Sequence, residues 1–371
     1  MALFDPKWLM SGIARDDLGC VPLAPYTSLA GQQFDHFQYW VNRHFKPSSY
    51  VQLRSDSQEH ARYFGHVGRG DISLYSLSLG NDSHIYSPCD DALYLILLLD
   101  GKGLHCSSGQ HLDSKTPEFF VQLPGEPLNF VFIKQSQQLV IRIDRSFLDA
   151  NQSRFDPMSL TASSDKLAFV KTATFNLLAA LKISQSFHQS ELLVDRWCED
   201  IEGVLTGSKI IPCRTVGYDE LPDYLQGFLD QLLLADQSVS MNDIVRNVSV
   251  SSRKLYQDFQ RLLECSPYQF IKLHRLRRIH MAMMKQDDWR LSDIATIHGF
   301  SHLGRFSSYY QSVFGELPSV VRSKFKDTIA TIDLNNELRG ENDCWMTGNA
   351  RGPVKEMDMR CQNCIKCLRA A

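Results

Sequence analysis

Side chains whose hydrogen-bonding groups match those of nucleic-acid bases stand at the start of two expected helices. Arg253 and Gln257 follow a serine that can cap a helix. A guanidinium pairs bidentately with guanine, and a side-chain amide does so with adenine. The second helix offers Arg305 and an apolar Leu303, which suit phosphate contact and packing on a thymine methyl group. The expected contact residues are Ser252, Arg253, Lys254, Tyr256 and Gln257 in the first helix and His302, Leu303, Gly304, Arg305 and Ser308 in the second.

Positive charge is concentrated around these two helices. Residues 240–326 hold 14 Lys and Arg against 7 Asp and Glu, whereas the whole chain has a formal net charge of -3. A basic segment within an acidic protein suits a polyanion, because each neutralised phosphate releases counterions. The distribution favours double-stranded DNA as a partner.

A second candidate group is a run of cysteines late in the chain. Cys361, Cys364 and Cys367, with Cys344 upstream, supply four thiols, enough for a tetrahedral zinc site or a cluster. Their spacing matches no common zinc or ferredoxin pattern, so we interpret residues 328–371 as an incidental flexible tail. Redox or metal sensing by the tail is the alternative. No cofactor or metal is expected.

Histidines and aromatic residues in the first half of the chain indicate a pocket without metal. His105 and His111 lack the His-x-His pair of metal-binding cupins. Tyr94, Phe119 and Phe130 are the candidate lining residues, although filling the core is the preferred interpretation of these aromatic side chains. No nucleophile elbow, phosphate-binding loop or paired-carboxylate site is recognisable, so the chain is not expected to be an enzyme.

Short apolar segments separated by turns predict a β-rich domain over residues 61–148. Residues 72–79 alternate, and residues 93–99 form a buried strand expected to end at the turn around Gly101. Further strands are predicted over residues 118–123, 128–133 and 139–143, the last two separated by Gln-Ser-Gln-Gln. This rhythm is typical of a small antiparallel barrel or jelly roll.

Helical periodicity begins after residue 145. Two amphipathic helices are predicted to pack on the barrel or on a second subunit. Their apolar faces are Leu167, Val170, Leu178 and Leu181, and Leu193, Trp197, Ile201 and Val204. Residues 207–217 lack periodicity and mark a linker. The fold class is therefore a multidomain α+β protein: a β-barrel with flanking helices, then an all-α domain.

The all-α domain contains two similar units, each a short helix, a turn and a serine-capped helix. The capped helices are predicted to begin at Ser251 and Ser301, and the short helix of the first unit at Ser240. A long helix from Pro267 to Lys285 joins the units and spans about 28 Å at about 1.5 Å per residue. Successive major-groove faces lie about 34 Å apart, so one chain could reach two of them. The expected core residues are Leu255, Phe259, Phe300, Phe306 and Tyr310, and Lys272, Arg275, Arg277 and Arg278 are expected to contact phosphates or to pair within the protein.

Residues 240–326 resemble the DNA-binding domain of the AraC/XylS family of bacterial transcription regulators. The resemblance rests on Ile294-Ala295-x-x-x-Gly299-Phe300-Ser301-x-x-x-Arg305-Phe306-Ser307, followed by Phe314-Gly315-x-x-Pro318 and Arg322. The first unit carries a weaker match in Leu255-x-x-x-Phe259 and Ser266-Pro267, with Arg275-Leu276 on the connecting helix. The β-rich segment is similar to the cupin-like effector-binding domain of that family.

The first unit departs from the family pattern at two positions. Val245 replaces the usual Ala, and Ser249 replaces the usual turn Gly, whereas the second unit keeps both as Ala295 and Gly299. Because glycine suits a left-handed turn residue, Ser249 is expected to carry slight conformational strain. On the long helix, Ile279 also replaces an expected Ala.

The resemblance implies an effector-responsive activator that binds DNA, contacts RNA polymerase and an unknown small molecule, and can form a homodimer. The predicted domains are residues 1–206 for effector binding and dimerisation, 207–219 as linker, 220–327 for DNA binding, and 328–371 as tail. The longest apolar run, Ala92 to Leu99, is too short to span a membrane, and no signal peptide is recognisable, so a cytoplasmic location is expected. An enzyme fused to a DNA-targeting module is the remaining alternative.

Overall fold

The computed structural model describes residues 23, 26–31, 34–45, 49–54, 62–80, 82–87, 90–114, 117–184, 186–207, 221–234, 248–263, 265–284 and 289–339. The chain divides into two compact units. One comprises residues 1–27, 65–73 and 146–322, and the other comprises residues 28–64, 74–145 and 323–371. The predicted short helix from Ser240, most of the linker and the cysteine tail lie outside the described residues.

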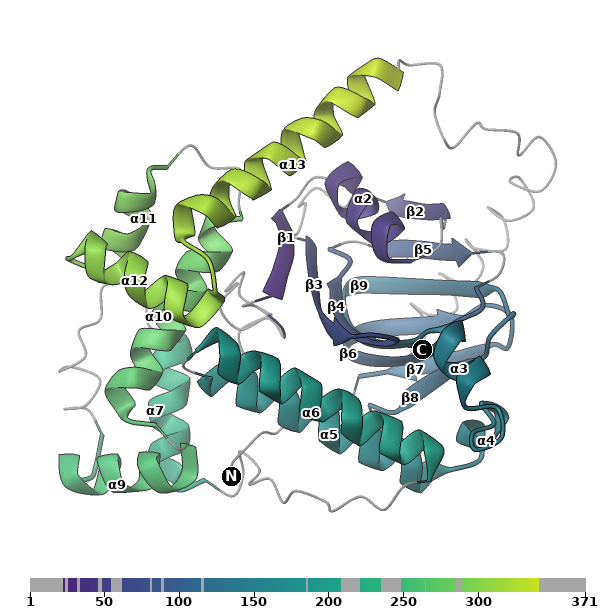
Figure 1. Ribbon diagram of the computed structural model, residues 1–371, viewed down its shortest axis with the longest axis horizontal. Coiled ribbons are helices and arrows are strands. Elements are labelled where there is room, and N and C mark those ends of the chain that lie inside the picture. The colour runs from purple at the N-terminus through teal and green to yellow at the C-terminus, as the bar shows by residue number, and fades with distance from the viewer. Residues whose placement is uncertain are drawn as a thin grey trace. The chain divides into compact units, whose positions relative to one another are not determined.

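The β-rich segment forms one nine-stranded sheet, in which β6 pairs with β7, β8 and β9 and the remaining strands follow the order β1-β3-β4-β9-β5-β2. It curls into the cupin-like architecture expected from the sequence (Figure 1). The strands are β1 (Thr27–Gly31), β2 (Ser49–Arg54), β3 (Arg62–Arg69), β4 (Ile72–Ser78), β5 (Asp82–Ser87), β6 (Leu93–His105), β7 (Gln110–Asp113), β8 (Phe119–Gln122) and β9 (Leu128–Ile143).

Two long strands form the centre of this sheet. β6 and β9 are antiparallel from Leu93 opposite Ile143 to His105 opposite Phe130, with register shifts on either side of Asp100. Two sequence predictions are therefore wrong: β6 does not end at residue 99, and no loop separates residues 128–133 from 139–143. The polar and glycine residues that predicted turns lie inside strands, because a bulge accommodates them there.

Gly101 allows the bulge. Its φ is +87°, and a Cβ at this position would lie 2.8 Å from the Cα of Ser136 on the partner strand. The backbones of β6 and β9 are therefore too close for any side chain at Gly101, which explains why glycine is found within a strand.

Helix α2 (Phe34–His44) was not predicted from the sequence. Phe37 is completely buried and Val41 is 8% exposed, one turn apart on the same face. This face closes one side of the β-rich unit, where its side chains meet those of the curled sheet around a cavity. The residues just before α2, Gly31-Gln32-Gln33, include none of the Ser, Thr, Asp or Asn residues that mark a helix start, so the sequence did not separate α2 from a loop.

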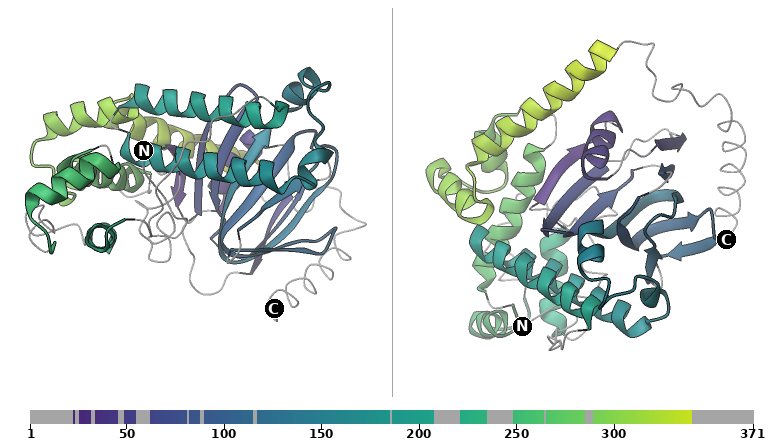
Figure 2. Two further views of the ribbon diagram at one scale, coloured as in Figure 1. Left: turned by 90° about the horizontal axis from the view of Figure 1, so that it is seen from below. Right: turned by 45° about the vertical axis from the view of Figure 1, so that its right-hand side comes forward.

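The helical unit contains the predicted pair of amphipathic helices, α5 (Ser164–Ile183) and α6 (Phe187–Thr206), which run side by side in both views (Figures 1 and 2). Ser163 and Ser186 cap these helices, because each side chain accepts a hydrogen bond from the backbone amide three residues further along the chain. Trp197 of α6 is buried and donates from Nε1 to Thr174 Oγ1 of α5 at 3.3 Å. Two short helices, α3 (Arg145–Ala150) and α4 (Met158–Thr161), precede them.

The remaining helices are α7 (Asp223–Leu234), α9 (Ser252–Leu263), α10 (Pro267–Met283), α11 (Leu291–Ile297), α12 (Leu303–Phe314) and α13 (Pro318–Arg339). The predicted cap of the first unit is confirmed, because Ser251 accepts from Lys254 N. Ser266, which was not predicted as a cap, forms a capping box with Gln269 at the start of α10. In the second unit α12 begins at Leu303 rather than at Ser301, and its N-cap His302 makes no side-chain cap. Among the described helices, none is long and apolar enough to cross a membrane.

Gly101→Ala should destabilise the protein more than Gly109→Ala. Both glycines have positive φ, which costs an L residue about 1–2 kcal/mol, but nothing lies within 4 Å of a Cβ at Gly109. The backbone of Ser136 blocks the Cβ at Gly101, so we expect an additional loss of about 1–3 kcal/mol in the free energy of unfolding. Urea titrations of both variants measure the difference, and equal losses would contradict the steric account.

Candidate functional site

The first of the two predicted DNA-binding units, here α7, α9 and the start of α10, is built around a single apolar cluster. Leu225 and Phe228 of α7 and Leu255 and Phe259 of α9 are almost completely buried, together with residues at the start of α10. The rings of Phe228 and Phe259 meet edge to face, with centroids 5.1 Å apart. The predicted core role of Leu255 and Phe259 is confirmed, and this core fixes which face of α9 points to solvent.

A buried carboxylate ties α9 to α7. Asp258 accepts hydrogen bonds from the Tyr224 hydroxyl and from Lys254 and Arg261, the latter two at 3.0 Å each. These donors, the tyrosine first, lower the pKa of Asp258 to about 2 against the opposing effect of burial. Lys254, expected to contact bases, is therefore held partly by the protein, since its ammonium is paired with Asp258 and lies 5.9 Å from the Tyr224 ring centroid.

The second helical unit turns at Gly299. This residue has φ +82°, and the Phe300 amide donates back to the Ala295 carbonyl, closing the turn between α11 and α12. Phe306 and Tyr310 of α12 are buried, and the Tyr310 hydroxyl lies 2.6 Å from His280 Nδ1 of α10. Their predicted core role is confirmed, whereas Phe300 is partly buried and packs against the edge of the same cluster.

The turn of the first unit differs from the prediction. Among the described residues other than glycine, only Leu23 has a positive φ, so Ser249 avoids the left-handed region. The expected strain at Ser249 is therefore wrong. A turn whose backbone stays at negative φ accepts serine without penalty.

The basic residues of α10 act mainly within the protein. Arg277 is 5% exposed and donates to the carbonyl oxygen of Leu181 at the end of α5. Lys272 lies 3.5 Å from the centroid of the Tyr309 ring, and the guanidinium of Arg275 lies against Gly299. Of the two roles predicted for this group, pairing within the protein therefore applies to these three.

The end of α5 and the start of α6 contact both helical units. Ala179 belongs to the core of the first unit, and Arg277 joins the Leu181 carbonyl to the connecting helix. The ring of Phe187 packs against Gly315, which ends α12. Burial lowers the pKa of the Arg277 guanidinium to about 10, so the charge persists at neutral pH despite its surroundings.

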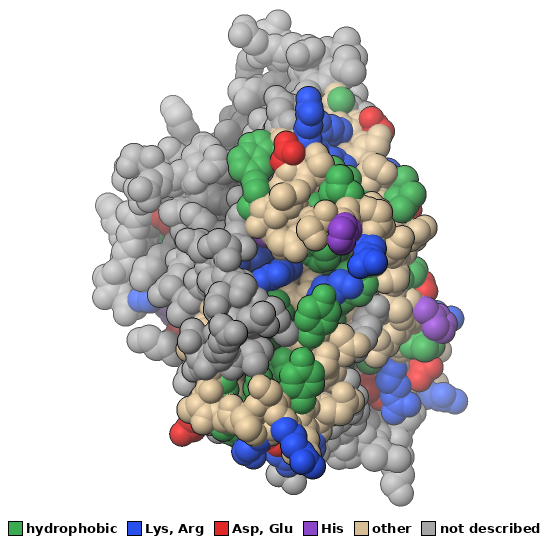
Figure 3. Space-filling view, turned by 90° about the vertical axis from the view of Figure 1, so that its left-hand side faces the viewer, with side chains coloured by type: hydrophobic (Ala, Val, Ile, Leu, Met, Phe, Trp, Pro, Cys, Tyr) green, Lys and Arg blue, Asp and Glu red, His purple; other side chains and the backbone are tan. Residues whose placement is uncertain are grey.

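The other predicted contact residues of both helices are exposed at the surface. Figure 3 shows one face of the protein, on which Lys and Arg side chains lie among hydrophobic ones. Tyr256 and Leu303 are each 45% exposed. Gly304 has nothing within 4 Å of where a Cβ would be, so a ligand can approach the backbone there. The exposed residues are Ser252, Arg253, Tyr256 and Gln257 on α9 and His302, Leu303, Gly304, Arg305 and Ser308 at α12.

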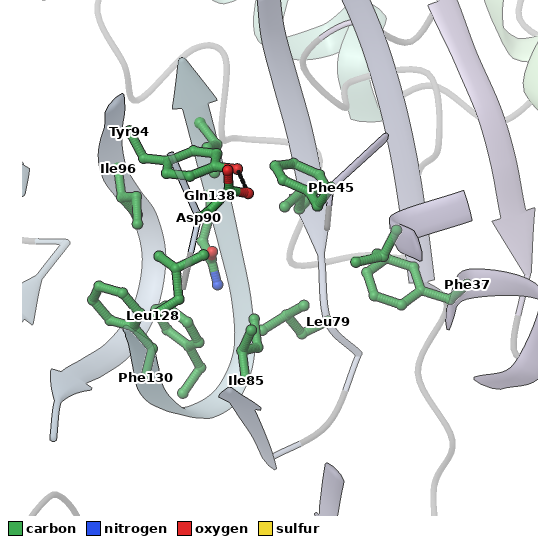
Figure 4. Close-up of a pocket in the computed structure, with 14 residues that line it drawn as sticks. Phe37, Phe45, Leu79, Ile85, Asp90, Tyr94, Ile96, Leu128, Phe130 and Gln138 are labelled. Carbon is green, nitrogen blue, oxygen red and sulfur yellow. Dashed lines mark hydrogen bonds between the residues drawn. The ribbon is translucent and has the colours of Figure 1, made fainter. Parts of the chain in front are cut away.

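A second candidate site is a cavity of about 60 Å³ inside the β-rich unit (Figure 4). Its walls are almost entirely apolar. The cavity is lined from α2 and the residue that follows it by Phe37, Val41 and Phe45. The end of β4 and β5 contribute Leu77, Leu79 and Ile85. The start of β6 and the segment before it contribute Asp90, Tyr94 and Ile96, and β9 contributes Leu128, Phe130, Phe132, Gln138 and Val140.

Three buried polar side chains interrupt this apolar wall. The Tyr94 hydroxyl donates to Asp90, whose other oxygen accepts from the Ala92 amide at 3.1 Å. Burial, reinforced by Asp90, raises the pKa of Tyr94 well above 10. Gln138 is 2% exposed, and its Nε2 has no hydrogen-bond partner among the described residues. Gln138 and Asp90 were missed because both stretches resembled turns in sequence.

Tyr94 and Phe130, predicted from the sequence, line this cavity, whereas Phe119 is not among its lining residues. His105 packs against Phe120 and Phe130, bonds to Ser108 and lies outside the lining, while His111 is exposed. No cluster of His, Cys, Asp and Glu that could hold a metal is found among the described residues. Cys344, Cys361, Cys364 and Cys367 lie outside them, so metal or redox sensing stays a prediction.

A sheet-lined cavity, and two exposed helices, α9 and α12, that pack against opposite ends of α10, match one class of protein: transcription regulators that join a ligand-binding domain to a DNA-binding domain. Residues 244–324 match the model of a helix-turn-helix domain, and residues 37–180 match that of an AraC-binding-like domain. The chain belongs to the AraC/XylS family, as its sequence indicated.

Relatives with described roles are transcription regulators. The XylDLEGF operon transcriptional activator of Pseudomonas putida is 21% identical over 279 residues, covering 70% of this chain and 84% of its own length. The probable thc operon regulatory protein of Rhodococcus erythropolis is 32% identical over 99 residues, covering 26% and 28%. These roles speak against the enzyme alternative.

Two solved structures also show similarity. The AraC-like transcriptional activator CuxR gives a TM-score of 0.35 at 12% identity, covering 66% of this chain and 90% of that chain. ToxT from Vibrio cholerae O395 gives 0.25 at 12% identity, covering 68% and 98%. Scores this low support no inference of their own, so the family assignment rests on the sequence matches.

Asp258→Asn should destabilise the protein in a pH-dependent way. The pKa of Asp258 is lowered from 3.8 to about 2, so its carboxylate stabilises the fold above pH 4, and this contribution is lost as the pH falls through 2. We expect the variant to lose roughly 1–2 kcal/mol at pH 7 and about half of that at pH 3. Urea titrations at both values measure this, with Asp293→Asn on the exposed surface of α11 as control. A loss that is the same at both pH values would refute the role of ionisation.

Proposed function

We propose that this protein is an effector-responsive transcription activator that reads two adjacent major-groove segments with α9 and α12. The observation that supports this most is the paired exposure of the two helices, each oriented by its own core, at opposite ends of α10. The 17 residues of α10 span about 25 Å at about 1.5 Å per residue, compatible with successive groove faces.

The two helices have different roles in this proposal. α9 presents Arg253 and Gln257, which can pair with base edges, and it provides most of the sequence readout. α12 presents Leu303 for a thymine methyl group, and Arg305 for phosphate. Because His302 provides no side-chain cap, the first amides of α12 also suit a phosphate oxygen. Lys254 contributes less than expected, since Asp258 holds it.

The remaining parts of the proposal follow from the family. The cavity accepts a small-molecule effector, and the effector shifts the protein between states only if it binds one of them better. The regulator acts in the cytoplasm and contacts RNA polymerase. It activates rather than represses, in keeping with the relative named as the XylDLEGF operon transcriptional activator. It works as a homodimer, and it is not an enzyme.

Arg253→Ala and Arg305→Ala should weaken DNA binding in different ways. A site is first selected from random duplexes with the full-length protein, and a scrambled duplex of equal composition is the comparison. Arg253→Ala should weaken binding to the selected site by about 5–150-fold, which corresponds to about 1–3 kcal/mol, with little change on the scrambled duplex. Arg305→Ala should weaken both to a similar, smaller extent, because phosphate contacts carry no sequence information.

Fluorescence anisotropy at fixed salt measures these affinities. Arg154→Ala, an exposed arginine in the turn after α3, is the matched control and should leave both affinities unchanged. Equal losses for Arg253→Ala and Arg305→Ala on both duplexes would contradict the division of roles. Failure of the full-length protein to select any duplex would contradict the proposed function itself.

A further inference from the structure

The cavity of the β-rich unit has a polarity that restricts what can bind in it. None of its described lining residues is Lys, Arg or His, and the one ionisable acid among them, Asp90, is 3% exposed. Both carboxylate oxygens of Asp90 accept hydrogen bonds, from the Tyr94 hydroxyl and the Ala92 amide, as a carboxylate ion does. A bound anion would therefore meet a negative charge in an apolar wall.

The nearby cation does not reverse this polarity. Arg142 interacts with the Tyr94 hydroxyl and is paired with Asp144 at 2.5 Å. Arg142, Asp144 and Asp90 together carry one positive and two negative charges, so the group is net negative. An incoming carboxylate would lose its hydration without gaining an unpaired cation, and burial of a charge without a partner is strongly unfavourable.

One unsatisfied donor faces the cavity. Gln138 is 2% exposed and its Nε2 lacks a hydrogen-bond partner among the described residues, although buried amides are nearly always paired. In Figure 4 its amide reaches into the space between Leu128, Ile85 and Leu79. A ligand atom that accepts a hydrogen bond would satisfy this amide, so the site lacks an acceptor rather than a cation.

We infer that the effector of this protein is a small, uncharged, largely apolar molecule with one hydrogen-bond acceptor, such as a ketone, ester or ether oxygen, which binds Gln138 Nε2. This inference rests on the proposed function, because it specifies the ligand class of the effector cavity. The volume of about 60 Å³ is below the roughly 150 Å³ that accommodates benzene, so a single ring displaces the half-buried Phe45 or Ile85.

Three molecules of nearly equal shape separate the alternatives. Acetophenone is uncharged and has a carbonyl acceptor, isopropylbenzene is uncharged without an acceptor, and benzoate carries a carboxylate. Calorimetry or competition binding with the full-length protein should show that acetophenone binds with a dissociation constant at least tenfold lower than that of benzoate. It should also bind about 2- to 12-fold tighter than isopropylbenzene, the contribution of one hydrogen bond.

Gln138→Met tests the donor. It keeps the length of the side chain but removes the amide, so acetophenone affinity should fall to that of isopropylbenzene while isopropylbenzene affinity is maintained. Gln110→Met on the exposed strand β7 is the matched control and should change neither. In the unsubstituted protein, benzoate binding equal to or tighter than acetophenone would overturn the inference and leave the proposed function intact.

DNA binding in the same samples distinguishes the remaining failures. If none of the three molecules binds while the selected duplex is still bound, the ligand class is wrong and DNA reading stands. If the duplex is not bound either, the proposed function has failed. Unchanged acetophenone affinity in Gln138→Met also overturns the assignment of the donor.

Discussion

The arrangement of the DNA-binding half depends on one helix that belongs to two cores. The start of α10 contributes Phe270 and Ile271 to the first cluster, and its remainder contributes Leu273, Leu276 and Ile279 to the second. Side chains on all sides of this helix are therefore buried, and its rotation about its own axis is fixed. Because each reading helix packs against one of these clusters, the orientation of α9 relative to α12 follows from the packing of α10.

Charged groups on α10 reinforce this packing. Arg277 is buried and bonded to Leu181, Lys272 lies over Tyr309, and Arg275 lies against the turn at Gly299. In sequence these residues look like a basic face for phosphate. The structure shows that part of the positive charge of the domain stabilises its packing, so fewer of its basic residues are available for contact with a nucleic acid.

Much of this organisation could be predicted from local patterns. Ser251 marks a helix start by capping, Pro267 marks one by its fixed φ, and Gly299 marks a turn by its backbone requirement, so these positions were identified correctly. The central strands were misjudged because the segments around Gly101 and Gln138 resemble turns by composition, and only the pairing of β6 with β9 shows that Gly101 lies in a bulge and that Gln138 pairs with Leu98. The cavity needed α2, Asp90 and Gln138, whose shared location depends on contacts distant in sequence.

The contacts of α5 and α6 have a consequence for how the protein can be divided. Ala179, Leu181 and Phe187 cover apolar and polar surface of both helix-turn-helix units. A fragment beginning at the linker near residue 215 would leave this surface open to water, with Arg277 and Gly315 uncovered and a patch prone to self-association. A fragment beginning near residue 146 keeps the helical pair on this surface and lacks residues 65–73, which belong to the same compact unit.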